Sequence, residues 1–422
     1  MPDSATLTIN RQTVVRNILA LFSGSMVSQG AAAITLFLMA RALGPDQYGQ
    51  YTSALTLTAF IGIFFNLGLD LWLLHEGGRN PQEIDQLSGS LLVIRLAAGI
   101  FWVSLFSIIA PLLQSDTFSV QLLRLGALFT WLNSIFATGL TAFRAILKNK
   151  ISAAQDAAFN ISILIATLAL FYYHSASAVN FLTARIMLQI AFLTLMAVQI
   201  QRWVGFRPQV RLIKDALVQF PAYLSSDFLA SLFMRMDILL VAFILTRKDA
   251  GLYSPAVGLI NTLFLIPNAV YSVIVPVLSN QFHNDPQRAW KTVKNSLLVL
   301  AAIGVLLMAG VLALAQVITI FLGQAYVEIR PVIYLLSPVI LLHSITYGMA
   351  TVLVATRQQA RRSKVQFAAV LVDLAANLIL LPRIGIAGAA ISYLLAEVVI
   401  IGGYSSIAYQ EYRRQQIRQP VS

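Results

Sequence analysis

The chain consists of long apolar runs separated by short polar connections. Windows of membrane-spanning length place the runs near residues 14–40, 51–75, 87–113, 121–146, 152–173, 179–200, 216–245, 252–279, 293–322, 328–355, 364–382 and 386–409. A helix needs about 20 apolar residues to cross the hydrocarbon core of a bilayer. The connections, among them "GPDQYG" and "HNDPQ", carry residues typical of turns. The pattern predicts an all-α integral membrane protein with about 12 transmembrane helices.

Composition favours a membrane protein over a soluble one. The sequence is 58% hydrophobic and 11% charged, whereas soluble domains are about 45–50% apolar and about 25% charged. A soluble fold of 422 residues would leave much of this apolar surface in water. The polar start "MPDSATLTINRQTVVRN" has no short apolar core followed by a cleavage site. We therefore expect the first run to be a retained span and not a signal peptide.

The basic residues predict how the helices cross the membrane. An even number of spans puts both termini on the same side. With the termini in the cytoplasm, 20 of the 29 Lys and Arg residues fall in cytoplasmic segments and 5 in outer segments, as the positive-inside rule requires. We expect a bacterial inner-membrane protein with both termini cytoplasmic. The net charge of +12 then reflects topology and contact with anionic membrane lipids, with no nucleic-acid partner.

Three short matches indicate that the second half of the chain repeats the first. Gly49-Gln50-Tyr51 matches Gly251-Leu252-Tyr253, "SLLV" at 90–93 recurs at 296–299, and S-x-x-Q-x-A-A at 152–158 recurs at 363–369, with offsets of 202, 206 and 211. Each match falls at an equivalent point among the spans. A shift of six spans preserves orientation, so we predict two six-helix lobes related by a pseudo-two-fold axis along the membrane normal, with a cleft between them.

This organisation divides the chain into five segments. We assign residues 1–13 to a cytoplasmic N-terminus, 14–200 to the first lobe, 201–215 to a cytoplasmic linker, 216–409 to the second lobe and 410–422 to a cytoplasmic tail. The polar corner "RALGPDQYGQY" and its looser copy "TRKDAGLY" join the first two helices of each lobe. Gly and Pro allow such a turn, and Tyr suits the membrane interface. The corner residues with expected structural roles are Gly44, Pro45, Gly49, Tyr51, Gly251 and Tyr253.

Ionisable residues inside the predicted spans are the candidates for function. Such a residue costs at least about 2.5–3.5 kcal/mol at the bilayer centre, so it normally faces a cavity or a partner. Arginine suits a phosphate because its guanidinium group binds two oxygens at once. The candidates for binding a diphosphate in the cavity are Arg95, Arg185 and Arg235.

Carboxylates inside the spans suit proton or sodium binding. The ion-coupling candidates are Asp70, Asp227, Asp237, Asp373 and Glu397. Arg235 and Asp237 are two residues apart and cannot pair along one helix, whereas Asp373 and Asn377 fall on one polar stripe with Gln366. For every one of these residues the alternative is a structural pair between helices, for example Arg95 with a carboxylate on a neighbouring span.

The chain lacks the motifs of common membrane enzymes. It has no cysteine, no P-loop, no H-E-x-x-H and no G-x-S-x-G, and its four histidines have no metal-ligand spacing. The predicted outer connections are about ten residues or shorter, which argues against a membrane ligase, polymerase or acyltransferase with an outer catalytic loop. We expect a transporter, not an enzyme, without a cofactor or a metal centre.

The corner and the second span resemble a known family. "ARALGPDQYGQYTSALTLTAFIGIFFNLGLD" (Ala40–Asp70), "RMDILLVAFILTRKDAGLYSPA" and "GIAGAAIS" are similar to the polysaccharide-transporter, or lipid-linked oligosaccharide flippase (Wzx-like), family. This family belongs to the multidrug/oligosaccharidyl-lipid/polysaccharide exporter superfamily. The resemblance covers nearly the whole chain, but its motifs are mostly structural and do not identify the cargo.

The resemblance implies twelve spans, two lobes and alternating access. It implies flipping of undecaprenyl-diphosphate-linked oligosaccharide repeat units to the outer leaflet for O-antigen, capsule or exopolysaccharide synthesis, driven by a proton or sodium gradient. A polymerase and a chain-length regulator would act in the same pathway. The alternative is a cation-coupled multidrug exporter of the same superfamily, which would favour a cavity dominated by Asp and Glu. A larger flippase of the peptidoglycan type carries two further spans, for which this chain has no room.

Overall fold

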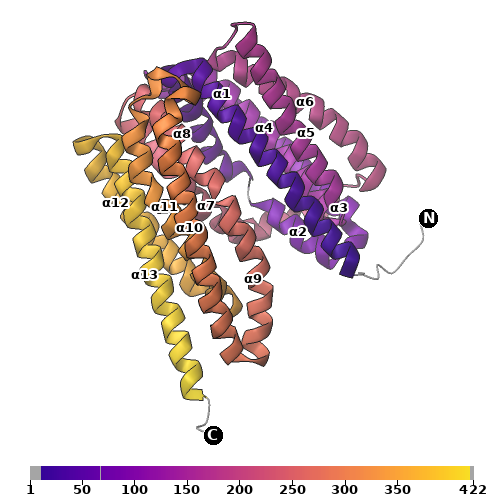
Figure 1. Ribbon diagram of the computed structural model, residues 1–422. Helices are drawn as coiled ribbons and strands as arrows, with labels where there is room; N and C mark the ends of the chain where they lie inside the picture. Colours follow the sequence, from indigo (N-terminus) through magenta and orange to yellow (C-terminus); the bar gives the residue numbers. More distant parts are fainter. Residues whose placement is uncertain (1–10, 67, 419–422) are drawn as a thin grey trace. The chain divides into compact units, whose positions relative to one another are not determined.

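The computed structural model describes the backbone of residues 11–66 and 68–418, and their side chains except at 11–22, 221–231, 233–234 and 416–418. Within these residues the fold is helical and contains no strand (Figure 1). The helices are α1 (Arg11–Asn66), α2 (Leu69–Arg79), α3 (Ile84–Ile109), α4 (Val120–Ala145), α5 (Asn149–Tyr172), α6 (Ala178–Trp203), α7 (Val210–Ile244), α8 (Arg247–Leu263), α9 (Leu265–Asn284), α10 (Pro286–Leu322), α11 (Ile329–Ala355), α12 (Gln359–Ile384) and α13 (Ile386–Arg418), with short 3₁₀ turns η1 (Pro81–Glu83), η2 (Ala110–Leu113) and η3 (Gln324–Tyr326).

The helices account for all twelve predicted spans. Ten segments of the described chain are long and apolar enough to cross a membrane. One of them belongs to α1, which a kink at Gly44 divides into the first and second predicted spans. Helix α7 covers the seventh predicted span. The predicted fold class, an all-α membrane protein with about 12 spans, is confirmed.

Two predicted spans are interrupted, and the first corner is tighter than the sequence suggested. Gly44, with φ 67° and ψ 170°, interrupts α1, and Pro45 begins the next helical arm. Proline is well suited to the first position of a helix, because the N–H that it lacks would have no acceptor within the helix there. The corner is therefore a kink at one residue, not a polar loop. The second predicted span breaks between Asn66 and Leu69, and the eighth breaks at Phe264.

The chain forms two compact units. Unit 1 comprises Met1–Ala42 and Ala54–Ser231, and unit 2 comprises Leu43–Ser53 and Leu232–Ser422. In unit 1, α4 packs against α2, α3, α5 and α6. In unit 2, α11 packs against α8, α9, α10 and α13, and α12 packs along α13 (Figure 1). The non-helical connection between α6 and α7 is 204–209, shorter than the predicted linker.

Matching backbone turns recur in the two units. Leu147, between α4 and α5, and Arg357, between α11 and α12, have φ of 59° and 60°. In both turns the amide of the next residue donates back to the preceding helix, with N···O distances of 2.9 and 2.7 Å. His174 (φ 51°) and Gly385 (φ 63°) repeat the correspondence at the next connection. These pairs lie 210 and 211 positions apart, so the local backbone supports the predicted duplication.

The two corner copies pack directly against each other within unit 2. A Cβ atom at Gly49 would overlap the carbonyl oxygen of Arg247, and a Cβ atom at Gly251 would overlap the carbonyl oxygen of Pro45. The Arg247 side chain also pairs with Asp46 at 3.0 Å. Both glycines are therefore needed because two helix backbones approach each other closely. This reciprocal contact explains why Gly-x-Tyr occurs at both corners.

The corner tyrosines are buried, not exposed at an interface. Tyr51 is 3% exposed and stacks on Tyr48 with ring centroids 6.3 Å apart. Tyr253 is fully buried. The close approach of the glycines draws the rings of Tyr51 and Tyr253, two residues further along the chain, into helix contacts.

Replacing Gly251 with Ala should destabilise the fold. The new methyl group meets a backbone carbonyl that cannot rotate away, and overpacking of this kind costs about 1–3 kcal/mol. Gly310→Ala is the matched control, because a Cβ atom at Gly310 meets no atom within 4 Å in the same unit. Thermal unfolding of the detergent-purified variants should show a lower midpoint for Gly251→Ala only. Equal midpoints for the two variants would contradict the described corner contact.

Candidate functional site

A buried arginine in unit 1 is paired with a carboxylate. Arg95 on α3 is 3% exposed. Its guanidinium group donates to Asp70 Oδ2 at 3.0 Å and to Asn66 Oδ1 at 2.7 Å. Thr138 on α4 donates to the other oxygen of Asp70 at 2.7 Å. A predicted phosphate-binding residue is thus bonded to a predicted ion-coupling residue. This is the structural pairing between helices that the sequence offered as the alternative role for Arg95.

The Arg95–Asp70 centre lies at the helix break between α1 and α2. Asn66 is the last residue of α1, Gly68 adopts a left-handed conformation with φ 62°, and Asp70 lies in the first turn of α2. Asn66 and Asp70, four residues apart across this break, both accept from the single guanidinium group. Arg95 Nε makes no hydrogen bond within the described residues, and the Asp70 side chain is 33% exposed. The centre is therefore bonded but not completely closed to solvent.

The other two predicted arginines lie in different surroundings. Arg185 on α6 is half-buried, with its guanidinium group 4.7 Å from the centre of the Phe129 ring. Arg235 on α7 is exposed. Arg95 and Arg185 thus belong to unit 1, and Arg235 belongs to unit 2.

Unit 2 contains a pair of buried aspartates from two helices. Asp237 on α7 is 6% exposed and Asp373 on α12 is 2% exposed. Asn377 Nδ2 donates to both carboxylates at 3.1 Å, and the Tyr253 hydroxyl donates to Asp237 at 3.1 Å. The two carboxyl groups also lie within hydrogen-bonding reach of each other. Asp237, Asp373, Asn377 and Tyr253 form what we call the aspartate pair.

Two carboxylates this close in an apolar interior cannot both stay charged without a positive partner. Asn377 Oδ1 is buried beside them and has no hydrogen-bond partner in the described residues. A carboxylic O–H could donate to this oxygen, and a small hard cation could accept it as a ligand together with carboxylate oxygens. The aspartate pair can therefore hold a proton or a sodium ion.

A second acidic centre in unit 2 includes a histidine. Glu397 on α13 is fully buried. His343 Nδ1 lies 2.6 Å from Glu397 Oε1, and the Thr346 hydroxyl donates to Oε2 at 3.3 Å. The imidazole ring stacks on Phe264 with centroids 4.0 Å apart, and Tyr347 meets it edge-on. The histidine fixes the orientation of a carboxylate that would otherwise be buried alone.

Sequence reasoning missed His343 and Tyr253 as participants in these centres, and Asp156 as a further carboxylate within a span. His343 has no metal-ligand spacing, but it shares a helical stripe with Thr346 and Tyr347, which should have suggested a partner for an intramembrane carboxylate. Tyr253 was assigned only to the corner. Asp156 on α5 accepts a hydrogen bond from Ser28 at 2.7 Å, and it falls within the predicted span 152–173.

One predicted candidate cannot be placed. Asp227 lies on α7 among the residues whose side chains are outside the described part of the chain. Of the remaining four ion-coupling candidates, Asp70 pairs with Arg95, Asp237 joins Asp373, and Glu397 is bonded to His343.

The fold and these centres define a class of protein: a multi-pass membrane protein whose helices hold bonded charges in their interior, as transport proteins do. A family model for polysaccharide biosynthesis proteins matches residues 38–331. The chain belongs to this polysaccharide biosynthesis protein family. No curated protein matches the chain significantly.

Solved structures share the fold at low sequence identity. The lipid II flippase MurJ in an inward closed conformation aligns at 14% identity and TM-score 0.70, covering 91% of this chain and 86% of that chain. An inward-facing multidrug resistance MATE transporter of the MOP superfamily aligns at 12% identity and TM-score 0.71, covering 93% of this chain and 96% of that chain. A MOP superfamily transporter from Pyrococcus furiosus aligns at 11% identity and TM-score 0.62, covering 96% of this chain and 95% of that chain. That transporter is described by the reverse polarity of its binding pocket. The fold is that of MOP-superfamily transporters and flippases.

Removing one partner of the Arg95–Asp70 pair should destabilise unit 1. Arg95→Met leaves a carboxylate without its cation, and breaking a buried pair costs about 3–5 kcal/mol, less where Asp70 is partly exposed. Combining Arg95→Met with Asp70→Leu should recover part of the loss, with a coupling of roughly 1–3 kcal/mol in thermal unfolding. Arg211→Met, which breaks an exposed pair with Asp215, is the control and should cost at most about 1 kcal/mol. If the destabilisation of the double variant equals the sum of the two single ones, Arg95 and Asp70 do not interact.

Proposed function

We propose that this chain is a flippase that moves diphosphate-linked oligosaccharide lipids, of the undecaprenyl type, from the cytoplasmic to the outer leaflet of a bacterial inner membrane. Its product would feed O-antigen, capsule or exopolysaccharide synthesis, where a polymerase and a chain-length regulator act next. Both termini would be cytoplasmic, as the distribution of 20 basic residues against 5 indicates.

The observation that carries this proposal is that a member of a polysaccharide biosynthesis family has ionisable groups inside its spanning helices. The chain is a polysaccharide biosynthesis protein by family, and its fold is shared by a lipid II flippase. Its spanning helices hold ionisable groups in their interior, at Arg95–Asp70 and at the aspartate pair. Intramembrane ionisable groups typically mark substrate or ion pathways.

Arg235 is the best candidate for contact with the diphosphate. It is exposed on a spanning helix, where contact with lipid alone would be costly. Arg95 already pairs with a carboxylate and Arg185 already packs on an aromatic ring. An exposed guanidinium group can bind two phosphate oxygens without first losing another partner.

The aspartate pair is the proposed ion-coupling site. Asp237, Asp373 and the free oxygen of Asn377 supply the hard oxygen ligands or proton acceptors that a gradient-driven carrier requires. Because these residues come from α7 and α12, binding a cation or proton there would hold the two helices together. Its release would let them separate, so ion binding could bias a conformational change.

A cation-coupled drug exporter is the second candidate. The buried carboxylates at Asp237, Asp373 and Glu397 and the likeness to a MATE transporter favour it. The family match favours the glycan substrate instead. Deletion of the gene separates the two, because loss of surface glycan supports the flippase, and unchanged glycan with new drug sensitivity supports the exporter.

Replacing Arg235 with Ala should stop surface glycan display in a deletion strain complemented by the variant. Losing one charge-assisted contact to phosphate weakens binding by roughly 10–100-fold. Arg235→Lys should restore display in part, because it keeps the charge but not the two-pronged contact. The readout is surface glycan at matched membrane abundance of each variant.

Arg124→Ala is the matched control. Arg124 is also exposed on a spanning helix, but its guanidinium group donates to the backbone oxygen of Ser107. This variant should display glycan normally. Full display from Arg235→Ala would remove Arg235 from the substrate site, and a deletion strain with unchanged glycan would overturn the proposed function itself.

A further inference from the structure

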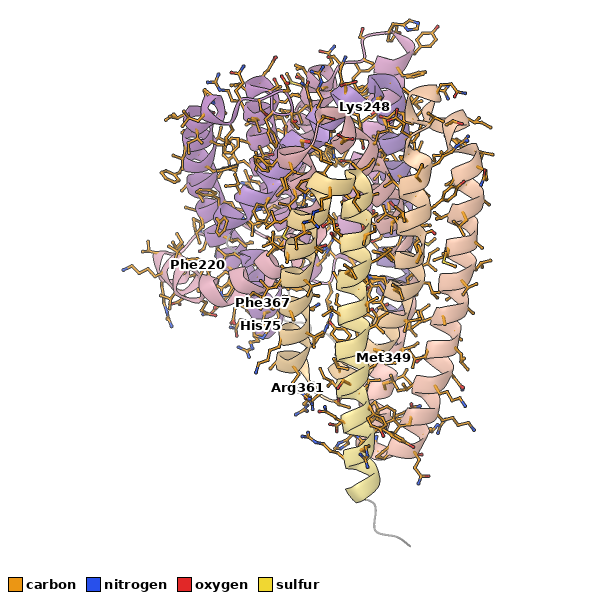
Figure 2. All side chains as sticks on the ribbon, turned by 90° about the vertical axis from the view of Figure 1, so that its left-hand side faces the viewer. His75, Phe220, Lys248, Met349, Arg361 and Phe367 are labelled. Atoms are coloured by element: carbon orange, nitrogen blue, oxygen red, sulfur yellow. The ribbon has the colours of Figure 1, made fainter. Side chains whose placement is uncertain are left out.

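Unit 2 carries an open groove of about 810 Å³ that the proposed transport function does not use. Side chains from α10, α11 and α13 form its walls. These three helices pack side by side. In Figure 2, Met349 of α11, which lines the groove, lies toward the end of unit 2 marked by Arg361, and Lys248 marks the opposite end. By the predicted topology, the Arg361 end is cytoplasmic.

One end of the groove is positively charged. Lys291 and Lys294 lie in the first turns of α10, both exposed and both lining the groove. Residues three apart share a helix face, so the two ammonium groups can reach one ligand. Neither forms an ion pair with a carboxylate of the described residues. The groove therefore offers two cations with no anion of their own.

Aromatic side chains surround the same end. Trp290, Tyr409 and Tyr412 line the groove, and the indole ring of Trp290 meets Tyr412 edge-on at 5.0 Å. The indole N–H donates to Gln415 at 3.0 Å. Trp and Tyr with one polar and one apolar edge are typical of the depth where headgroups meet hydrocarbon. This places the lysines at the level of lipid headgroups.

The groove as a whole has the length of one leaflet, and the part beyond the lysines is apolar. Leu297, Leu298 and Ala301 of α10 and Ile345 of α11 continue it away from the lysines. From residue 290 to residue 301 the helix rises about 16 Å, at about 1.5 Å per residue. One leaflet is half of a hydrocarbon core of about 30 Å. From residue 294 to residue 301 the apolar part rises about 10 Å, so it accommodates the upper part of an acyl chain.

We propose that this groove is a binding site for an anionic phospholipid of the cytoplasmic leaflet. The phosphate contacts Lys291 and Lys294, and one acyl chain lies against Leu297, Leu298 and Ala301. Basic pockets between spanning helices on the cytoplasmic side bind anionic headgroups in this way. The inference concerns a lipid separate from the transported substrate and does not depend on the proposed transport function.

Native mass spectrometry of the detergent-purified chain tests the proposal. We expect phosphatidylglycerol to bind more tightly than phosphatidylcholine with the same acyl chains. Lys291→Gln combined with Lys294→Gln should weaken phosphatidylglycerol binding by roughly 10–30-fold, to the level of phosphatidylcholine. Ala301→Phe keeps both lysines but fills the apolar part, and it should weaken binding of both lipids.

Lys150→Gln combined with Lys364→Gln is the matched control. It removes the same charge from the predicted cytoplasmic side at two exposed lysines outside the groove, and it should bind phosphatidylglycerol as the wild type does. The proposal is overturned if the control loses as much affinity as the groove variant, which would mean that bulk charge attracts the lipid. It is equally overturned if the groove variant binds normally, or if Ala301→Phe leaves acyl-chain binding unchanged.

Discussion

The ion pair between Arg95 and Asp70, with 3.0 Å between its nitrogen and oxygen, shows the constraint on which much of this structure depends. Hydrocarbon offers no partner to a charge, so a spanning helix that carries one must bring another helix to meet it. In unit 1, Asn66 and Asp70 meet Arg95 of α3. In unit 2, Asn377 bridges Asp237 and Asp373, and His343 meets Glu397. Each polar contact also fixes how two helices pack.

The corner contact is a second constraint, and it acts through backbone instead of charge. Gly49 and Gly251 let two helix backbones touch, and this contact positions Tyr253 two residues further along. The hydroxyl of Tyr253 then donates to Asp237. A duplicated structural corner is in this way connected to the proposed ion-coupling site. The duplication thus explains the position of Tyr253 as well as the number of helices.

The sequence predicted the number, positions and type of the spans because apolar length is a local property. It also identified most of the interior charges, since each stands out in an apolar run. It could not predict their partners. Asp70 and Arg95, or His343 and Glu397, are separated by 25 and 54 positions, and only helix packing shows that they meet. The hydrogen bond from Tyr253 to Asp237 was missed for the same reason, because the two residues are 16 positions apart and meet only through helix packing.

Flipping by the purified chain tests the central claim most directly. The protein would be reconstituted into vesicles with a fluorescent polyprenyl-diphosphate-linked oligosaccharide, and a membrane-impermeant quencher would report the fraction of lipid in the outer leaflet over time. We predict that vesicles with the wild-type chain exchange the lipid between leaflets, and that protein-free vesicles and the Arg235→Ala variant do not. Absence of exchange by well-folded wild-type protein, together with movement of a cationic dye, would contradict the account and identify a drug exporter.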